Sequence, residues 1–451
     1  MENNNISILG AGLIGSLLGI YLKKRGLDVS IYEKRPDKRA DTPKEEGRSI
    51  NMALSERGWK ALEKVGLKDK IKDLAIPMYG RRIHDEHGNT TFQPYGKEGE
   101  AIYSISRGKF NQILVDEAER VGVNMFFDHK CEEVNTNKRQ IRFSIPGWER
   151  KLVNSSVIIG SDGAYSSLRN SMQKQERFDF TQHYISHGYK ELSIPATADG
   201  EFAMDPNALH IWPRGKFMLI ALPNPDKSFT CTLFLPFEGT KVCFDKIHDE
   251  KDVDSVFRTY FDDAYALMPN LKKEFFSNPT SALITINCYP WAKNQCLLIG
   301  DASHAMVPFY GQGMNCGFED CFVLDGLIDK LGTTSWDLLF EKFQKIRKPD
   351  TDAIGQLALE NFIEMRDSVS DPKFIIRKKI EARLHELYPT EWIPLYTMVT
   401  FTDIPYAEAY AQGKIQDQIM NKIMTDPLIT QNWDKLDYGD IIDQVETARM
   451  V

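Results

Sequence analysis

The chain lacks the cysteine pattern of a zinc site or a disulfide framework. Its seven cysteines contain no C-x-x-C pair and are odd in number, so reduced thiols in the cytoplasm are the simplest interpretation. No run of about 18 apolar residues is present, which argues against a transmembrane helix. The polar start Met1–Asn5 also lacks the basic and apolar regions of a signal peptide.

The chain has fewer basic than acidic residues. Its net charge of -8 and the absence of a long basic run argue against nucleic acid as a partner. The short cluster of Lys34, Arg35, Lys38 and Arg39 fits a solvated face or the neighbourhood of a diphosphate. With 451 residues, 42% hydrophobic and 27% charged, the composition is typical of a soluble enzyme of two or three domains.

A glycine-rich stretch near the start carries the first functional signal. Ile6, Ile8 and Leu9 predict a buried strand, and Gly10-Ala11-Gly12-Leu13-Ile14-Gly15 follows with G-x-G-x-x-G spacing. In this motif the first glycine permits the tight turn, the second admits a pyrophosphate, and the third lets helix and strand pack closely. The stretch therefore predicts a dinucleotide site.

An acidic residue ends the next predicted strand. Glu33 follows Val29-Ser30-Ile31-Tyr32 and could accept hydrogen bonds from a ribose diol, whereas it would repel a 2′-phosphate. This position disfavours NADP and leaves FAD or NAD. An ordinary strand-helix-strand unit with an incidental glutamate is the alternative.

Two later strands also end at glycine, in Val157-Ile158-Ile159-Gly160-Ser161-Asp162-Gly163 and Cys296-Leu297-Leu298-Ile299-Gly300-Asp301. We expect both strands to join the first in one mostly parallel sheet. Asp301 could also be the N-cap of the following turn, and Ser55 is expected to cap a helix from Glu56 to Val65.

The remaining patterns complete the predicted fold. Residues 184–236 alternate as in an antiparallel sheet, residues 78–92 predict a hairpin turning at Asp85–Asn89, and residues beyond Ser335 have mainly helical periodicity. The predicted class is α/β: a Rossmann-like FAD-binding domain interleaved with an antiparallel-sheet substrate domain, followed by a helical region. The expected boundaries are 1–75, 100–180 and 285–332 for the first, 76–99 and 181–284 for the second, and 333–451 for the third.

These motifs together resemble the single-component, NAD(P)H-using FAD-dependent aromatic hydroxylases. Within that class the chain resembles the kynurenine 3-monooxygenase family over essentially its whole length. The resemblance rests on Arg48–Ser55, Leu209–Arg214, Phe309–Asn315 and Asn361–Arg366.

The resemblance implies a set of cofactor contacts. Asp301 would bind the ribityl chain, and the helix starting near Met314 would place backbone N–H groups at the flavin pyrimidine edge, where reduced flavin is negative. Asp162 is ambiguous, since its Asp-Gly signature is associated with both flavin and nicotinamide binding. The cofactor residues expected are Gly10, Gly12, Leu13, Ile14, Gly15, Glu33, Lys34, Arg35, Ala53, Arg107, Asp162, Asp301, Gly313, Met314 and Asn315.

The resemblance also implies a substrate site for L-kynurenine. Arg81 and Tyr95 would bind the α-carboxylate, and Asn361 and Tyr396 would add polar contacts. The residues themselves do not distinguish Arg81 from Arg82. An apolar slot for the ring is expected from Leu209, Met218, Ile220, Phe234, Pro308 and Phe309. Trp212 is interpreted as core, and His304 is given no role.

The implied reaction is hydroxylation of L-kynurenine to 3-hydroxy-L-kynurenine by O₂. The oxygen would be carried by a C4a-hydroperoxyflavin, so no catalytic side chain and no metal is expected. NADPH is implied as a transient co-substrate without a Rossmann site of its own, because the chain has only one G-x-G-x-x-G.

Two alternatives stay open: an FAD monooxygenase of another aromatic or quinone-precursor substrate, and a non-catalytic module of the same fold, as in prenylated-GTPase chaperones. One departure from the family concerns the C-terminus. Animal members carry an apolar membrane segment there, whereas this chain has polar residues around Asp434–Asp440, so a soluble bacterial type without a membrane segment is expected.

Overall fold

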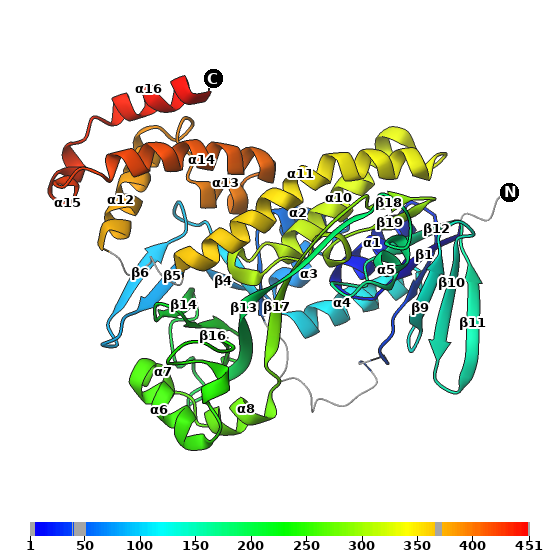
Figure 1. The fold of residues 1–451 in the computed structure, drawn as a ribbon, viewed down its shortest axis with the longest axis horizontal. Helices are drawn as coiled ribbons and strands as arrows, with labels where there is room; N and C mark the ends of the chain where they lie inside the picture. The colour runs from blue at the N-terminus through cyan, green and yellow to red at the C-terminus, as the bar shows by residue number, and fades with distance from the viewer. Residues whose placement is uncertain (1–4, 38, 40–50, 366–371, 450–451) are drawn as a thin grey trace.

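The computed structural model describes residues 5–37, 39, 51–365 and 372–449 (Figure 1). Residues 40–47 lie outside the described residues. The same is true of Lys38, of residues 48–50 and of Arg366, which belong to stretches named above.

A six-stranded sheet brings the three glycine-marked strand ends together. Its order is β18-β19-β12-β1-β2-β8, parallel except for the β18–β19 pair. The strands are β18 (Ala292–Lys293), β19 (Cys296–Leu298), β12 (Val157–Gly160), β1 (Asn5–Leu9), β2 (Asp28–Tyr32) and β8 (Asn124–Phe126). Leu9 pairs with Gly160, and Gly160 pairs with Leu298. The predicted convergence is confirmed, because all three strands end at the same edge of the sheet.

Helices enclose this sheet and share its core. Residues from strands and helices, such as Ile8, Leu17, Ile158 and Phe318, are fully buried in one cluster. The helices are α1 (Leu13–Lys24), α2 (Glu56–Lys64), α3 (Lys68–Lys72), α4 (Arg107–Arg120), α5 (Ser167–Met172), α9 (Asp301–His304) and α10 (Gly313–Leu331). Two small sheets flank them, one of β3 (Asn51–Leu54), β7 (Ile102–Ser106) and β4 (Ile76–Met78), the other of β9 (Lys130–Asn135), β10 (Gln140–Ile145) and β11 (Trp148–Asn154).

A second, seven-stranded sheet has the order β17-β13-β16-β15-β14-β5-β6. Its strands are β5 (Gly80–His84), β6 (Thr90–Pro94), β13 (Asp179–Ile194), β14 (Ala208–Pro213), β15 (Met218–Pro223), β16 (Phe229–Pro236) and β17 (Ser281–Tyr289). The predicted hairpin is confirmed between β5 and β6. The sheet is not purely antiparallel as expected, because β5 enters it beside β14 in the parallel sense.

The two faces of this second sheet pack against different helices. One face, with Leu219 and Leu233, is covered by α6 (Glu250–Tyr260), α7 (Asp262–Tyr265) and α8 (Leu271–Ser277). The other face, with Ile211 and Phe234, packs against α11 (Trp336–Ile363), α13 (Leu395–Phe401) and α14 (Tyr406–Ile423). Figure 1 shows the C-terminal helices and α6–α8 on opposite sides of β5 and β14.

The last helices form a further layer around a core of their own. This layer comprises α12 (Pro372–Leu387), α15 (Ile429–Asn432) and α16 (Tyr438–Arg449), which pack with α14 around Ile380, Met420 and Ile442. In the described ranges no helix combines the length and the apolar character needed to cross a bilayer.

Neither of the two candidate helix caps makes a side-chain capping hydrogen bond. Ser55 precedes α2, but its side chain makes no cap hydrogen bond; its Oγ donates to Gln312 Oε1 (3.3 Å) and its backbone N–H to Asn315 Oδ1 (2.9 Å). Asp301 is the first residue of α9, and Gly300 occupies the N-cap position. Both segments are therefore held by contacts distant in sequence rather than by local capping.

Candidate functional site

The glycine turn has a geometry that would suit a pyrophosphate. A Cβ added at Gly15 would lie 2.0 Å from Gly10 O, and one at Gly10 would lie 2.8 Å from Ser161 O, so both glycines are required by protein packing. Gly12 differs, because a Cβ there would have no atom within 4 Å. Since Gly12 is the N-cap of α1 and the first turn of α1 contains no acidic residue, this open space faces a helix end that favours an anion.

Glu33 lies beside this turn as an ionised carboxylate. Its Oε2 accepts from the Ala11 N–H (2.9 Å), and its Oε1 accepts from Arg35 N (3.0 Å) and Arg35 Nε (2.7 Å). Burial alone would raise the Glu33 pKa, but Arg35 and the Ala11 N–H hold that pKa below its ordinary value. A carboxylate offers about four acceptor positions, so one remains for a ribose hydroxyl.

Asp162 reaches the same turn from the second strand end. Its Cα would lie 3.0 Å from a Cβ at Gly10, and its Oδ2 accepts from Ser167 N (2.7 Å). Its Oδ1 is buried and has no hydrogen-bond partner among the described residues. Burial is the main cause that raises the Asp162 pKa above its ordinary value.

The third strand end brings Asp301 and the start of α10 to this edge. Asp301 is exposed and follows the end of β19 after Ile299 and Gly300. α10 begins at Gly313 without a side-chain cap or an acidic residue in its first turn. Asn315 is fully buried, and its side chain bonds Ser55 N, Ala53 O and Gly311 O, each at 2.9 Å. The Asn315 side chain thus connects β3 to α10. We therefore expect Ala53, Met314 and Asn315 to contact a flavin through their backbone atoms.

The other predicted cofactor residues surround the same edge. Ile14 packs against Gly300 and Gly317, where added Cβ atoms would lie 3.1 Å and 2.5 Å from its side chain. Arg107 is exposed at the start of α4, and Lys34 is exposed just after β2. Leu13 is buried in the first turn of α1.

A second group of predicted residues meets around Arg81. The Arg81 guanidinium lies 5.7 Å from the Tyr95 ring centroid and 5.2 Å from that of Tyr396, and these two rings stack at 5.1 Å. Arg81 Nε and Tyr95 Oη are buried, and neither has a hydrogen-bond partner among the described residues. Arg82, by contrast, points to the other side of β5 and pairs with Asp205 at 2.7 Å. The register therefore distinguishes the two arginines, which the sequence could not.

The electrostatics of this group favour a bound anion. Burial opposes the positive charge of Arg81, but Tyr95, Tyr396 and Glu364 raise its pKa above the ordinary value, so Arg81 stays charged. Burial and the neighbouring Tyr396 raise the Tyr95 pKa, so this phenol stays protonated as a donor. A half-buried cation with a buried, unused Nε–H beside phenol donors is suited to a carboxylate.

The predicted apolar residues share one sheet face with Arg81. Arg81 pairs with Leu209, Ile211 with Ile220, and Met218 with Phe234, and paired residues point to the same side. Phe309 covers this face, 4.9 Å from Phe234 between ring centroids, next to the exposed Pro308. Asn361 donates to Phe309 O at 2.6 Å, so its first task is to hold this loop.

Two residues of this group were not predicted as site residues. Tyr310 stacks on Tyr396 at 5.6 Å, and Glu364 contributes to the raised pKa values of both Arg81 and Tyr310. Both residues lie inside stretches that carry the family resemblance, and this resemblance is the sequence signal that could have identified them. Their role at Arg81 follows only from the packing of α11 and α13 over the sheet.

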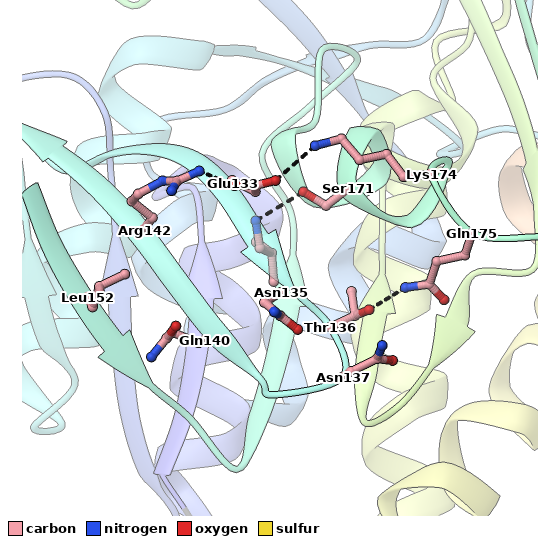
Figure 2. Close-up of a pocket in the computed structure, with 11 residues that line it drawn as sticks. Glu133, Asn135, Thr136, Asn137, Gln140, Arg142, Leu152, Ser171, Lys174 and Gln175 are labelled. Carbon is pink, nitrogen blue, oxygen red and sulfur yellow. Dashed lines mark hydrogen bonds and ion pairs between the residues drawn. The ribbon is translucent and has the colours of Figure 1, made fainter.

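A pocket of about 320 Å³ elsewhere on the molecule does not fit this chemistry. It lies between α5 and the β9–β11 sheet, and Figure 2 shows its lining. Glu133 there forms ion pairs with both Arg142 and Lys174, so each of these charges already has a partner within the protein. None of the predicted site residues lines the pocket.

Comparisons with known proteins agree with the architecture. The family model described as "FAD binding domain" matches residues 3–354. Among solved structures, a tetrameric form of 2-methyl-3-hydroxypyridine-5-carboxylic acid oxygenase is similar with a TM-score of 0.67 at 19% identity, covering 82% of this chain and 95% of that chain. At this identity the likeness shows the fold alone. The family model defines an FAD-binding protein, and the fold agrees with that class.

Curated relatives are much closer in sequence. The chain is 46% identical over 438 residues to the kynurenine 3-monooxygenase of Christiangramia forsetii, with 96% of each chain covered. It is 44% identical over 426 residues to that of Sus scrofa, covering 93% of this chain and 89% of the relative. The chain belongs to the kynurenine 3-monooxygenase family, and the alternative of a non-catalytic module is set aside.

Proposed function

We propose that this flavin monooxygenase hydroxylates L-kynurenine to 3-hydroxy-L-kynurenine with NADPH and O₂. The observation that carries the proposal is Arg81, whose buried Nε–H is unused and whose guanidinium lies beside the stacked rings of Tyr95 and Tyr396. An amino-acid substrate brings the carboxylate that this arrangement lacks. The names of the relatives support the same substrate.

We further propose that the predicted units carry these tasks separately. The unit of residues 1–75, 100–180 and 285–332 would hold FAD, the unit of 76–99 and 181–284 would supply the sheet face under the substrate, and residues 333–451 would cover it. The fit to FAD rests on the open space at Gly12 and on the unpartnered Oδ1 of Asp162.

The residues that would hold FAD follow from their positions. The Gly10–Gly15 turn would bind the pyrophosphate, Glu33 the ribose, Asp301 the ribityl chain and the start of α10 the pyrimidine edge. When bound, FAD supplies the redox and oxygen chemistry, with NADPH as a transient hydride donor.

The remaining tasks of the protein are to orient the substrate and to exclude water from the site. Arg81, with Tyr95 and Tyr396, would bind the substrate carboxylate, while Leu209, Ile220 and Phe234 would contact its ring. Asn361 would act by holding Phe309 over the ring. No side chain is required to form a covalent bond with the substrate, so positioning is the main contribution of the protein.

The proposal is tested by following NADPH consumption by the FAD-loaded enzyme. We expect L-kynurenine to stimulate consumption and to yield a product heavier by one oxygen atom. Phenol and a quinone-precursor aromatic serve as comparison substrates. Coupled product from one of these, without any from L-kynurenine, would contradict the proposal and favour another aromatic substrate.

Replacing Tyr95 by phenylalanine should raise the KM for L-kynurenine by about tenfold to a hundredfold. A hydrogen bond to a charged group is worth about 1.5–3 kcal/mol, and the phenylalanine ring keeps the stacking on Tyr396. Since Tyr95 Oη bonds no described residue, the melting temperature of the ligand-free protein should not fall. Steady-state kinetics and a thermal melt check both parts, and an unchanged KM would remove Tyr95 from the site.

A further inference from the structure

Asp320 is a fully buried carboxylate beneath the Gly300–Asp301 turn. Its Oδ2 accepts from Gly300 N (3.2 Å) and bonds His304 Nε2 (2.6 Å), while its Oδ1 accepts from Arg347 Nε (2.7 Å). Gly300 and His304 lie at the two ends of α9, whose first residue is Asp301. One side chain of α10 thus holds both ends of the short helix that carries Asp301.

The backbone at Gly300 needs such support. Gly300 has φ 60° and ψ -142°, a conformation that residues with a side chain rarely adopt. Its carbonyl accepts from His304 N (3.0 Å) and Ser303 Oγ (2.9 Å), and its N–H is bound by Asp320. These bonds fix the direction in which the next residue, Asp301, leaves the strand.

The charge of Asp320 is held by its partners. Burial alone would raise the Asp320 pKa, but His304 and Arg347 keep that pKa below its ordinary value, so Asp320 is ionised and only accepts. His304 Nε2 must therefore donate its N–H. His304 and Arg347 come from α9 and α11, so three helices meet at this carboxylate.

A metal site is the competing interpretation of this cluster. Potential ligand atoms of His304, Cys316 and Asp320 lie within 4.8 Å of one another. However, Arg347 occupies the space between two of them, with Nε on Asp320 Oδ1 and Nη2 3.4 Å from Cys316 Sγ. A cation would have to displace a buried guanidinium, which favours a structural task for the cluster.

We infer that Asp320 and His304 are positioning residues of the FAD site, which set the Gly300–Asp301 backbone so that Asp301 meets the ribityl chain. The inference rests on the proposed role of Asp301. The inference identifies the buried contacts, distant in sequence, on which the role of Asp301 depends.

The first test measures FAD binding to Asp320→Asn. We expect the FAD Kd of the apoprotein to rise at least about tenfold, or about 1.4 kcal/mol, and the visible circular dichroism of the remaining bound flavin to change. Asp325→Asn is the matched control, because Asp325 lies on the same helix, is 4% exposed and pairs with Arg25 and Lys64. Arg25 follows the far end of α1, about 18 Å along the helix from the glycine turn. The control should melt at a lower temperature with an unchanged FAD Kd.

A pair of variants at His304 keeps the test decisive if Asp320→Asn does not fold. His304→Gln places an amide N–H near the position of Nε2 and should retain FAD affinity, whereas His304→Ala should lose it. Equal FAD Kd and equal flavin dichroism in the alanine variant and the unaltered protein would overturn the inference.

The Asp301→Ala variant distinguishes a failure of the proposed role of Asp301 from a failure of the inference about Asp320 and His304. If this variant keeps full FAD affinity, the ribityl role of Asp301 is wrong and the inference fails with it. If Asp301→Ala loses FAD while Asp320→Asn behaves like Asp325→Asn, the role of Asp301 stands and only the inference is overturned.

Discussion

Replacing Arg81 by methionine is expected to raise the KM for L-kynurenine by about 30-fold or more while FAD stays bound. Loss of one partner from a desolvated charge pair costs about 2–5 kcal/mol, and methionine retains much of the side-chain length and apolar packing. Because FAD is proposed to bind at the edge of the other sheet, its Kd should not change. Steady-state kinetics and a flavin titration measure the two quantities.

Arg82 supplies the matched control for this prediction. It is adjacent in β5, also charged and also close to an aromatic ring, but it pairs with Asp205 on the opposite face. Arg82→Met should leave KM nearly unchanged. Equal effects of the two substitutions on KM would show that the carboxylate site is misassigned.

Replacing Gly12 by valine is expected to prevent FAD binding without unfolding the protein. A Cβ at Gly12 meets no protein atom within 4 Å, and the backbone there is extended (φ -71°, ψ -176°), which valine adopts readily. The added methyl groups would occupy the space proposed for the pyrophosphate. We expect at least about a hundredfold loss of FAD affinity, or about 3 kcal/mol, with an unchanged melting temperature of the apoprotein.

Gly15→Ala should behave differently, although both glycines belong to one motif. Its Cβ would lie 2.0 Å from Gly10 O and 2.4 Å from Ser161 Oγ, so protein atoms must move. Overpacking of this kind costs about 1–3 kcal/mol, and the apoprotein should melt at a lower temperature. A stable Gly12→Val variant with stoichiometric flavin would refute the phosphate role of the turn.

The sequence was most informative where structure depends on short-range pattern. Buried parallel strands read as runs such as Val157–Ile159, and each run ends at a glycine that the close packing at the sheet edge requires. The position of the cofactor edge could therefore be predicted. Trp212, interpreted as core, is fully buried as expected.

Choices that depend on register could not be predicted from the sequence. Arg81 and Arg82 are adjacent and chemically identical, and only the pairing of Arg81 with Leu209 decides which one faces Tyr95. Ser55 likewise has a local interpretation as a helix cap, whereas in the structure its backbone N–H bonds Asn315, 260 positions away.

Buried polar contacts between residues distant in sequence were missed for a related reason. The bonds of His304 and Arg347 to Asp320 join residues from three helices, and no local pattern marks them. The C-terminal stretch is weakly patterned, yet it forms α16, because Ile441, Ile442 and Val445 find a partner surface in α14 and neighbouring helices. Tertiary packing, rather than helix propensity, decides such segments.

The most direct test of the account is a crystal structure of the enzyme with FAD and L-kynurenine bound. We predict the pyrophosphate over Gly12, the substrate carboxylate on Arg81 and Tyr95, and the aromatic ring between Phe234, Phe309 and the flavin. L-kynurenine seated away from Arg81, or FAD bound away from the Gly10–Gly15 turn and Asp301, would contradict it.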